Sequence, residues 1–382
     1  MFFTGVFGPI TPFLVVEFGL SASEVGLLSS AIYAGAILLA LPMGKFVDRR
    51  GTRQPIIIGT LLIPLLLFLL SRSTGLWMML IIFLVSGFPR SLILPATEKA
   101  VAETTVGQER ALAMGLVHSG PPLAGSFISA VVPALAVALS WRAGIGLLAL
   151  GLIPAFFLLR SMLVRLPLSD QNADDADNTP PGSILKLIPD PRFLLPTIIC
   201  GLFQGGHIII LSFFVLYLAE VLHLSPVTAG MLLATAQLLA VMARPSWGLI
   251  SDRWLGGRRD LALVIMGISG AVSLLVLAFL PESPSLALLI PLAVTIGVSV
   301  VSARPMISTF AIEKAGIEDA GKISAILLVS TWGMFILMPI IFGSIVTVTG
   351  SWTASWIMAA TLLAAGGMLP AVHRRPSAGE AT

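Results

Sequence analysis

The fold is decided by a ten-residue stretch that reads Gly44-Lys45-Phe46-Val47-Asp48-Arg49-Arg50-Gly51-Thr52-Arg53. Half of these residues are charged, although the chain of 382 residues is 57% hydrophobic and only 11% charged. A soluble domain carries about 25% charged residues, so this chain cannot cover a surface that faces water. Long apolar runs flank the stretch on both sides. We therefore predict that these runs cross a lipid bilayer and that the charged stretch is a loop between them.

The apolar runs are continuous, as in residues 56–70 and 261–280, and they lack the alternation that is typical of a transmembrane barrel strand. The backbone must then satisfy its hydrogen bonds within helices. The sequence predicts an all-α membrane protein, and a spanning helix needs about 20 residues. On that rule twelve spans are expected, at residues 2–19, 25–46, 55–71, 76–97, 110–139, 142–164, 192–220, 226–249, 261–280, 286–309, 322–349 and 352–372.

The spans form two related sets of six. The pattern Leu20-Ser21, Gly26, Gly44 and Asp48-Arg49 recurs 204 positions later as Leu224-Ser225, Gly230, Gly248 and Asp252-Arg253. Further on, Gly87 and Pro95 match Gly297 and Pro305. Two parallel six-helix repeats are a transporter architecture with a site near the midplane between them. We expect an N-terminal bundle at 1–165, a polar, acidic cytoplasmic linker at 166–191, a C-terminal bundle at 192–372 and a cytoplasmic tail at 373–382.

The basic residues predict the orientation, because Lys and Arg concentrate in cytoplasmic loops. With a cytoplasmic N-terminus the outer loops hold only Arg72 and Arg142. We expect both termini in the cytoplasm, the inner membrane of a bacterium as the location, a monomer, and no nucleic-acid partner. The inner loops and tails then hold Lys45, Arg49, Arg50, Arg53, Lys99, Arg110, Arg160, Arg165, Lys186, Arg192, Arg253, Arg258, Arg259, Lys314, Lys322, Arg374 and Arg375.

The opening stretch closely resembles the signature loop of the major facilitator superfamily, and a degenerate copy follows Gly248. This resemblance implies a secondary transporter that works by alternating access. It also implies that the two loops latch the halves together on the cytoplasmic side, with Asp48 and Arg49 near Gly321-Lys322. Gly44 and Gly248 are expected to let a helix end pack closely against its neighbour. The alternative is that the charges only mark the inner face. The latch residues would be Gly44, Asp48, Arg49, Arg53, Gly248, Asp252 and Arg253.

The fourth and fifth spans bear on the subfamily. The run Gly115-Leu116-Val117-His118-Ser119-Gly120-Pro121-Pro122-Leu123-Ala124-Gly125 partly resembles the Gly-Pro motif of the family's antiporters, although Ala124 replaces one glycine. The arginine that drug/proton antiporters carry in the fourth span is absent, and Phe83 and Leu84 occupy its region. The alternative reading of the fifth-span run is helix packing alone.

Ionisable groups inside a membrane are costly and are candidate functional residues. Arg90 and Arg304 lie within predicted spans, Arg244 is interpreted as an anchor near the inner interface, and no Asp or Glu lies near the middle of any span. Positive charge without a central carboxylate favours an anion, because guanidinium pairs with carboxylate or phosphate. The structural alternative for each arginine is a buried, carbonyl-bonded group. The predicted substrate-binding residues are Arg90, Arg304, Tyr33, Gln204, His207, Gln237 and Trp332.

His118 and His207 could relay a proton, because histidine titrates near neutral pH, or they could join helices by hydrogen bonds. The leading hypothesis is a secondary transporter that moves a small organic anion with proton coupling or exchange. The alternative is an efflux antiporter for lipophilic or cationic compounds, and a third hypothesis is a membrane receptor or enzyme. The sequence shows no metal cluster, nucleophile triad or phosphate loop, so we expect no enzyme, cofactor or metal.

Overall fold

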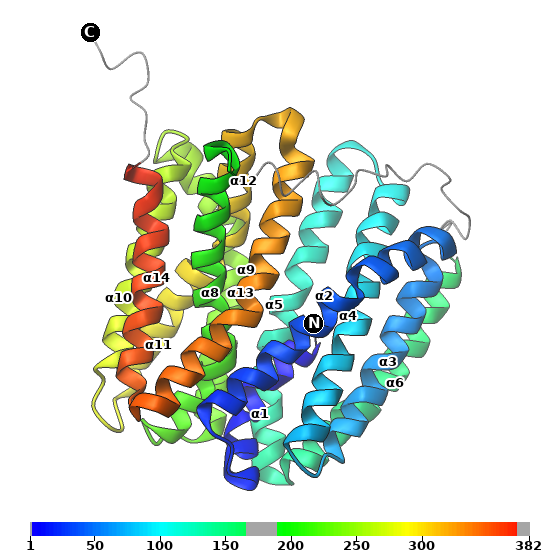
Figure 1. Cartoon of the computed structure of the whole chain (residues 1–382). Coiled ribbons are helices and arrows are strands. Elements are labelled where there is room, and N and C mark those ends of the chain that lie inside the picture. The colour runs from blue at the N-terminus through cyan, green and yellow to red at the C-terminus, as the bar shows by residue number, and fades with distance from the viewer. Residues whose placement is uncertain (1, 166–188, 373–382) are drawn as a thin grey trace. The chain divides into compact units, whose positions relative to one another are not determined.

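The computed structural model describes residues 2–165 and 189–372, so most of the predicted linker and the predicted tail lie outside the described residues, with Lys186, Arg374 and Arg375. The described residues are almost entirely helical (Figure 1). The helices are α1 (Phe2–Phe18), α2 (Ala22–Arg50), α3 (Arg53–Ser71), α4 (Leu76–Thr104), α5 (Gly107–Ala138), α6 (Trp141–Arg165), α8 (Pro191–Glu220), α9 (Pro226–Arg253), α10 (Arg259–Ala278), α11 (Leu286–Ile296), η1 (Gly297–Val301), α12 (Arg304–Ala315), η2 (Ile317–Asp319), α13 (Ala320–Thr349) and α14 (Trp352–Val372).

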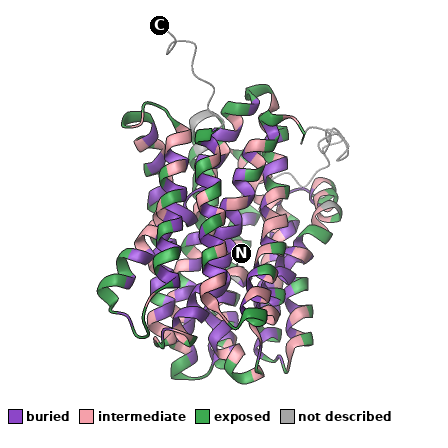
Figure 2. Ribbon diagram, turned by 60° about the vertical axis from the view of Figure 1, so that its left-hand side comes forward, coloured by how far each residue is buried: buried purple, intermediate pink, exposed green. Residues whose placement is uncertain are grey.

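Eleven helical segments of the described chain are long and apolar enough to cross a membrane, and α1 is a shorter apolar helix. Together they confirm the predicted twelve spans and the all-α class. Many large apolar side chains are exposed, as Leu61, Leu65 and Phe157 are, and exposed and buried residues share the same helices (Figure 2). An apolar exposed surface of this kind suits lipid rather than water.

By their contacts, the described residues divide into two compact units. Unit 1 holds residues 2–165 with 211–234, and unit 2 holds 189–210 with 235–372. In unit 1, glycines bring α2 and α4 together: a Cβ added at Gly35 would meet the Leu84 carbonyl oxygen, and one added at Gly87 would lie 2.2 Å from the Ala36 nitrogen. Unit 2 repeats the device, since a Cβ at Gly297 would lie 2.2 Å from the Ala236 oxygen. Gly87 and Gly297, which match in the repeat, therefore each allow two helices to approach closely within their own unit.

The charged stretch differs from the predicted loop. Helix α2 continues to Arg50 and α3 begins at Arg53, so only Gly51 and Thr52 separate the two helices. Arg49 and Arg50 lie in the last turn of α2, where positive charge is favourable next to the helix dipole. Gly51 ends the helix with a φ of 68°, which favours glycine.

Two local details concern the ends of the helices. Helix α2 begins with a capping box: the Ser21 hydroxyl accepts from the Glu24 amide at 3.3 Å, and the Glu24 carboxylate accepts from the Ser21 amide at 2.8 Å. The predicted tenth span is not one regular helix. It changes to a π-helical turn at Gly297–Val301 and resumes as α12 at Arg304. Arg304 is thus the first residue of a helix, where the sequence placed it inside one.

Candidate functional site

The best-defined candidate site lies on α4 in unit 1. The close approach of α2 and α4 at Gly35 and Gly87 places Arg90, about one turn after Gly87, against Tyr33. The Arg90 Cζ atom lies 5.0 Å from the centroid of the Tyr33 ring, a cation–π geometry. Tyr33 is fully buried, and its hydroxyl donates to Thr4 Oγ1 at 3.3 Å. The structure therefore brings two of the predicted substrate-binding residues together and adds Thr4 from α1.

The guanidinium of Arg90 is incompletely hydrogen-bonded. Its Nε atom is buried and has no hydrogen-bond partner, and no carboxylate of the described residues forms an ion pair with it. A buried donor without an acceptor costs about 1–3 kcal/mol, and more when the group is charged. The site can thus bind a negatively charged ligand that accepts a hydrogen bond from Arg90.

Arg304 has a different environment in unit 2. Its Nη1 atom donates to Thr331 Oγ1, to the Leu327 carbonyl at 3.4 Å and to Cys200 Sγ at 3.2 Å. These bonds join the break in the tenth span to α8 and α13. The geometry resembles the buried, carbonyl-bonded alternative that the sequence left open, and the substrate-binding role of Arg304 stays a prediction.

His207 and Arg244 lie near one another in unit 2. The His207 ring packs edge-on against Phe335 with centroids 6.1 Å apart, its Nδ1 is buried without a hydrogen-bond partner, and Arg244 acts on it electrostatically. Arg244 Nη2 donates to the Val301 carbonyl at 3.5 Å. Arg244 is therefore turned toward the tenth span, and its interpretation as an interface anchor stays a prediction.

The remaining predicted residues of unit 2 are buried or half-buried. Gln204 on α8 and Gln237 on α9 are each 4% exposed, and Trp332 on α13 is half-buried. Their part in binding stays a prediction.

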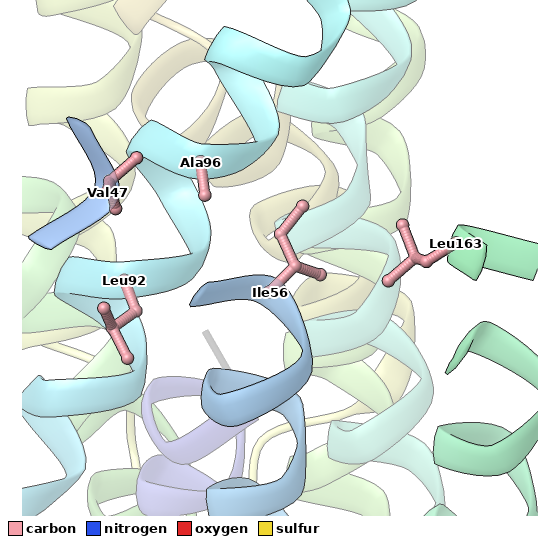
Figure 3. Close-up of a cluster of buried hydrophobic side chains, with 5 residues drawn as sticks. All are labelled: Val47, Ile56, Leu92, Ala96 and Leu163. Atoms are coloured by element: carbon pink, nitrogen blue, oxygen red, sulfur yellow. The ribbon is translucent and has the colours of Figure 1, made fainter. Parts of the chain in front are cut away.

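Three residues of the predicted latch, Asp48, Arg53 and Asp252, have partners in their own units. In unit 1, Asp48 lies 3.5 Å from Lys99 Nζ, and Arg53 Nε donates to the Leu163 carbonyl at 3.2 Å. A cluster of buried apolar side chains joins α2, α3, α4 and α6 through Val47, Ile56, Leu92, Ala96 and Leu163 (Figure 3).

In unit 2, Arg259 Nη2 lies 2.6 Å from Asp252, and its Nε donates to Glu313 at 3.3 Å. The sequence reasoning missed Arg259 and Glu313 as partners, because spacing along the chain does not reveal contacts between helices.

The expected role of the two loop glycines is wrong for this structure. A Cβ added at Gly44 or at Gly248 would meet no atom of the described residues within 4 Å. Neither glycine is a point of close helix packing here. Gly35, Gly87 and Gly297 have that role instead.

One further polar contact crosses from α4 to α5. The His118 Nε2 atom lies 3.6 Å from Glu98 Oε1, and both side chains are partly exposed. The sequence singled out His118 but not Glu98. Among the described residues, no group of three His, Cys, Asp or Glu could hold a metal ion.

The family model described as Major Facilitator Superfamily matches residues 1–335 and 209–381, which together cover nearly the whole chain. The chain belongs to the Major Facilitator Superfamily. This is a family of membrane transporters rather than of enzymes, and the apolar helices of the described chain are those of a multi-pass membrane protein. Among solved structures it is similar to the nucleoside transporter NupG, with a TM-score of 0.78, 15% identity and coverage of 98% of this chain and 96% of that one. At this identity the likeness shows the fold alone.

Sequence relatives of this superfamily member differ in their named substrates. Monocarboxylate transporter 13 of Rattus norvegicus is 28% identical over 334 residues, 85% of this chain and 74% of that protein. Hexuronate transporter of Bacillus subtilis is 27% identical over 131 residues, 34% of this chain and 31% of that protein. Multidrug resistance protein 2 of Bacillus subtilis is 29% identical over 132 residues, 33% of each chain. The matched part spans about a third of the two Bacillus proteins.

Proposed function

We propose that this transporter moves a small organic anion by alternating access and that Arg90 binds the anion. The observation that carries the proposal is the buried Nε of Arg90, which has no acceptor in the described part of the chain. A carboxylate would accept from Nε and from one terminal nitrogen in two parallel hydrogen bonds. The Tyr33 ring, 5.0 Å from the guanidinium carbon, covers one face of the group.

The relatives support the same chemistry. A monocarboxylate and a hexuronate are both carboxylate anions, and each is named in a relative of this chain. We propose that Gln204, His207, Gln237, Trp332 and Arg304 are substrate-binding residues as well, and that transport is coupled to protons or to exchange.

The oligomeric state, the membrane and the orientation of the protein are also proposals. We infer that it works as a monomer in a bacterial inner membrane with both termini in the cytoplasm, because Lys and Arg concentrate on that side. The domain bounds 1–165, 166–191 and 192–372 and the latch formed by the two signature loops belong to the same proposal.

Efflux of a lipophilic or cationic compound is the second candidate. A relative named Multidrug resistance protein 2 and the fifth-span run favour it. A cation would require a carboxylate, and Glu98, which is partly exposed on α4, would be the group to bind it.

Uptake by proteoliposomes separates the two candidates. The panel is radiolabelled lactate, pyruvate and glucuronate, with ethidium as the cationic cargo. A hydrogen bond to a charged group contributes about 1.5–3 kcal/mol, so Arg90→Ala should lower anion uptake at low concentration roughly 10- to 150-fold. Arg72→Ala is the matched control, because Arg72 lies over Phe68 at the end of α3. Unchanged uptake of every accepted anion by Arg90→Ala would refute the role of Arg90.

A further inference from the structure

Glu98 and His118 form a charged pair on unit 1 that the anion site does not use. Glu98 lies on α4 and His118 on α5, with His118 Nε2 3.6 Å from Glu98 Oε1. The side chains are 38% and 57% exposed, respectively, so neither is enclosed by the described part of the chain. We infer that this pair is the proton-binding site that couples proton movement to anion transport. The inference rests on the proposed function, which leaves the coupling group open.

The chemistry of the pair suits reversible protonation. Uptake of one proton converts the His118 imidazole to an imidazolium, and the Glu98 carboxylate then faces an opposite charge at ion-pair distance. The pair changes from one net negative charge to none. Release of the proton to water restores the starting state, so no other reactant is required.

The second histidine is less suited to this task. His207 Nδ1 is buried without a hydrogen-bond partner. A protonated His207 would bury this donor without an acceptor among the described residues, whereas a protonated His118 faces a carboxylate.

The position of Glu98 links the pair to Arg90. Both residues lie on α4, eight positions apart, which corresponds to about 12 Å of helix rise. Loss of the negative charge at the pair makes the potential around Arg90 more positive, and lipid and protein screen this effect less than salt water does. Proton binding therefore favours anion binding. By thermodynamic linkage the anion favours proton binding to the same degree.

Other charged groups near α4 and α5 already have partners in unit 1. Lys99 lies 3.5 Å from Asp48, Arg53 bonds the Leu163 carbonyl, and Glu17 of α1 accepts from Trp141 and Arg142. Thr52 donates to Glu103 at 3.4 Å. The helices that pack against α4 and α5 also carry Lys45, Arg49, Arg50, Glu109, Arg160 and Arg165.

The test compares two modes of lactate transport in proteoliposomes. Accumulation driven by an inward proton gradient requires coupling, whereas exchange of internal for external lactate without a gradient does not. We expect His118→Asn and Glu98→Gln to lower gradient-driven accumulation at least tenfold and to change exchange less than about twofold. The double variant Glu98→His with His118→Glu should recover accumulation, because it keeps both groups in contact. His223→Asn is the matched histidine control, since asparagine tolerates the φ of 54° at this position.

Three results would overturn the inference: accumulation by His118→Asn at the wild-type level, equal loss of accumulation and exchange in both single variants, or a wild type that exchanges lactate without accumulating it. If the wild type neither accumulates nor exchanges any anion of the panel, the proposed function fails instead. Proton-gradient-driven movement of ethidium by the same variants then tests the role of Glu98 and His118 independently of anion transport. Loss of gradient-driven ethidium movement in His118→Asn would support its role as the coupling site, and wild-type movement would refute it.

Discussion

Replacement of Gly87 by alanine perturbs the close approach of α2 and α4. The added Cβ would lie 2.2 Å from the Ala36 nitrogen, 2.4 Å from the Gly35 carbonyl carbon and 2.9 Å from the Ala36 Cα, all backbone atoms. Ordinary contact begins at 3.4 Å, so the two helices must separate by about 1 Å locally. Overpacking of this kind costs about 1–3 kcal/mol. The opposite contribution, the higher helix propensity of alanine, is at most about 1 kcal/mol.

The separation of the helices also reaches the anion site. Arg90 follows Gly87 by about one turn of α4 and stacks on Tyr33, which precedes the contact residue Gly35 on α2. A shift of about 1 Å in the distance between the two helices weakens a hydrogen-bonded site that depends on their register. We therefore expect Gly87→Ala to raise the KM for an accepted anion about tenfold or more and to lower the apparent Tm.

The assay combines thermal unfolding of the purified protein in detergent with anion uptake by proteoliposomes. Gly44→Ala is the matched control, because its Cβ would meet no described atom within 4 Å in the same helix pair. That variant should keep or raise the apparent Tm and leave KM unchanged. A Gly87→Ala protein with the Tm and KM of wild type would refute the close-packing argument. An equal effect of Gly44→Ala would refute the claim that the effect arises at the Gly87 contact.

Two further substitutions test the arginines. Tyr33→Leu removes the ring under Arg90. Because a cation–π contact contributes about 0.5–2 kcal/mol, the KM for anion uptake should rise about 2- to 30-fold. Tyr33→Phe keeps the ring and should stay close to wild type in the same assay. Thr331→Val removes an acceptor of Arg304, a bond to a charged group worth about 1.5–3 kcal/mol. It should lower the apparent Tm with little change in KM, and a raised KM at unchanged Tm would indicate that Arg304 binds the anion instead.

The sequence predicted the fold because lipid imposes strong constraints on composition and length. A helix that crosses a bilayer needs a long apolar run, and such runs are visible without any knowledge of contacts. Helix ends were less predictable. The charges of Lys45–Arg50 indicated a loop, yet α2 continues to Arg50, because basic residues stabilise a helix C-terminus as readily as they mark a loop. The π-helical turn at Gly297–Val301 left no comparable signal in the apolar pattern.

The candidate site was predictable only in part. An arginine in an apolar run is conspicuous, so Arg90 and Arg304 were found from the sequence. Tyr33 was also found, but its contact with Arg90 was not. Thr4, Cys200 and Thr331 were missed as partners, because they come from other helices. Glu98 was not found either, because its contact with His118 joins α4 to α5 and spacing along the chain does not reveal it.

The contrast between the two arginines explains why contacts decide their function when sequence alone does not. Both are costly to place in a membrane. Arg304 offsets that cost within the protein, because one of its terminal nitrogens has three acceptors on α8 and α13. Arg90 has an aromatic ring on one face and a buried Nε without an acceptor. A ligand that supplies the missing acceptor gains free energy at Arg90 that it could not gain at Arg304, where binding would first have to break existing bonds.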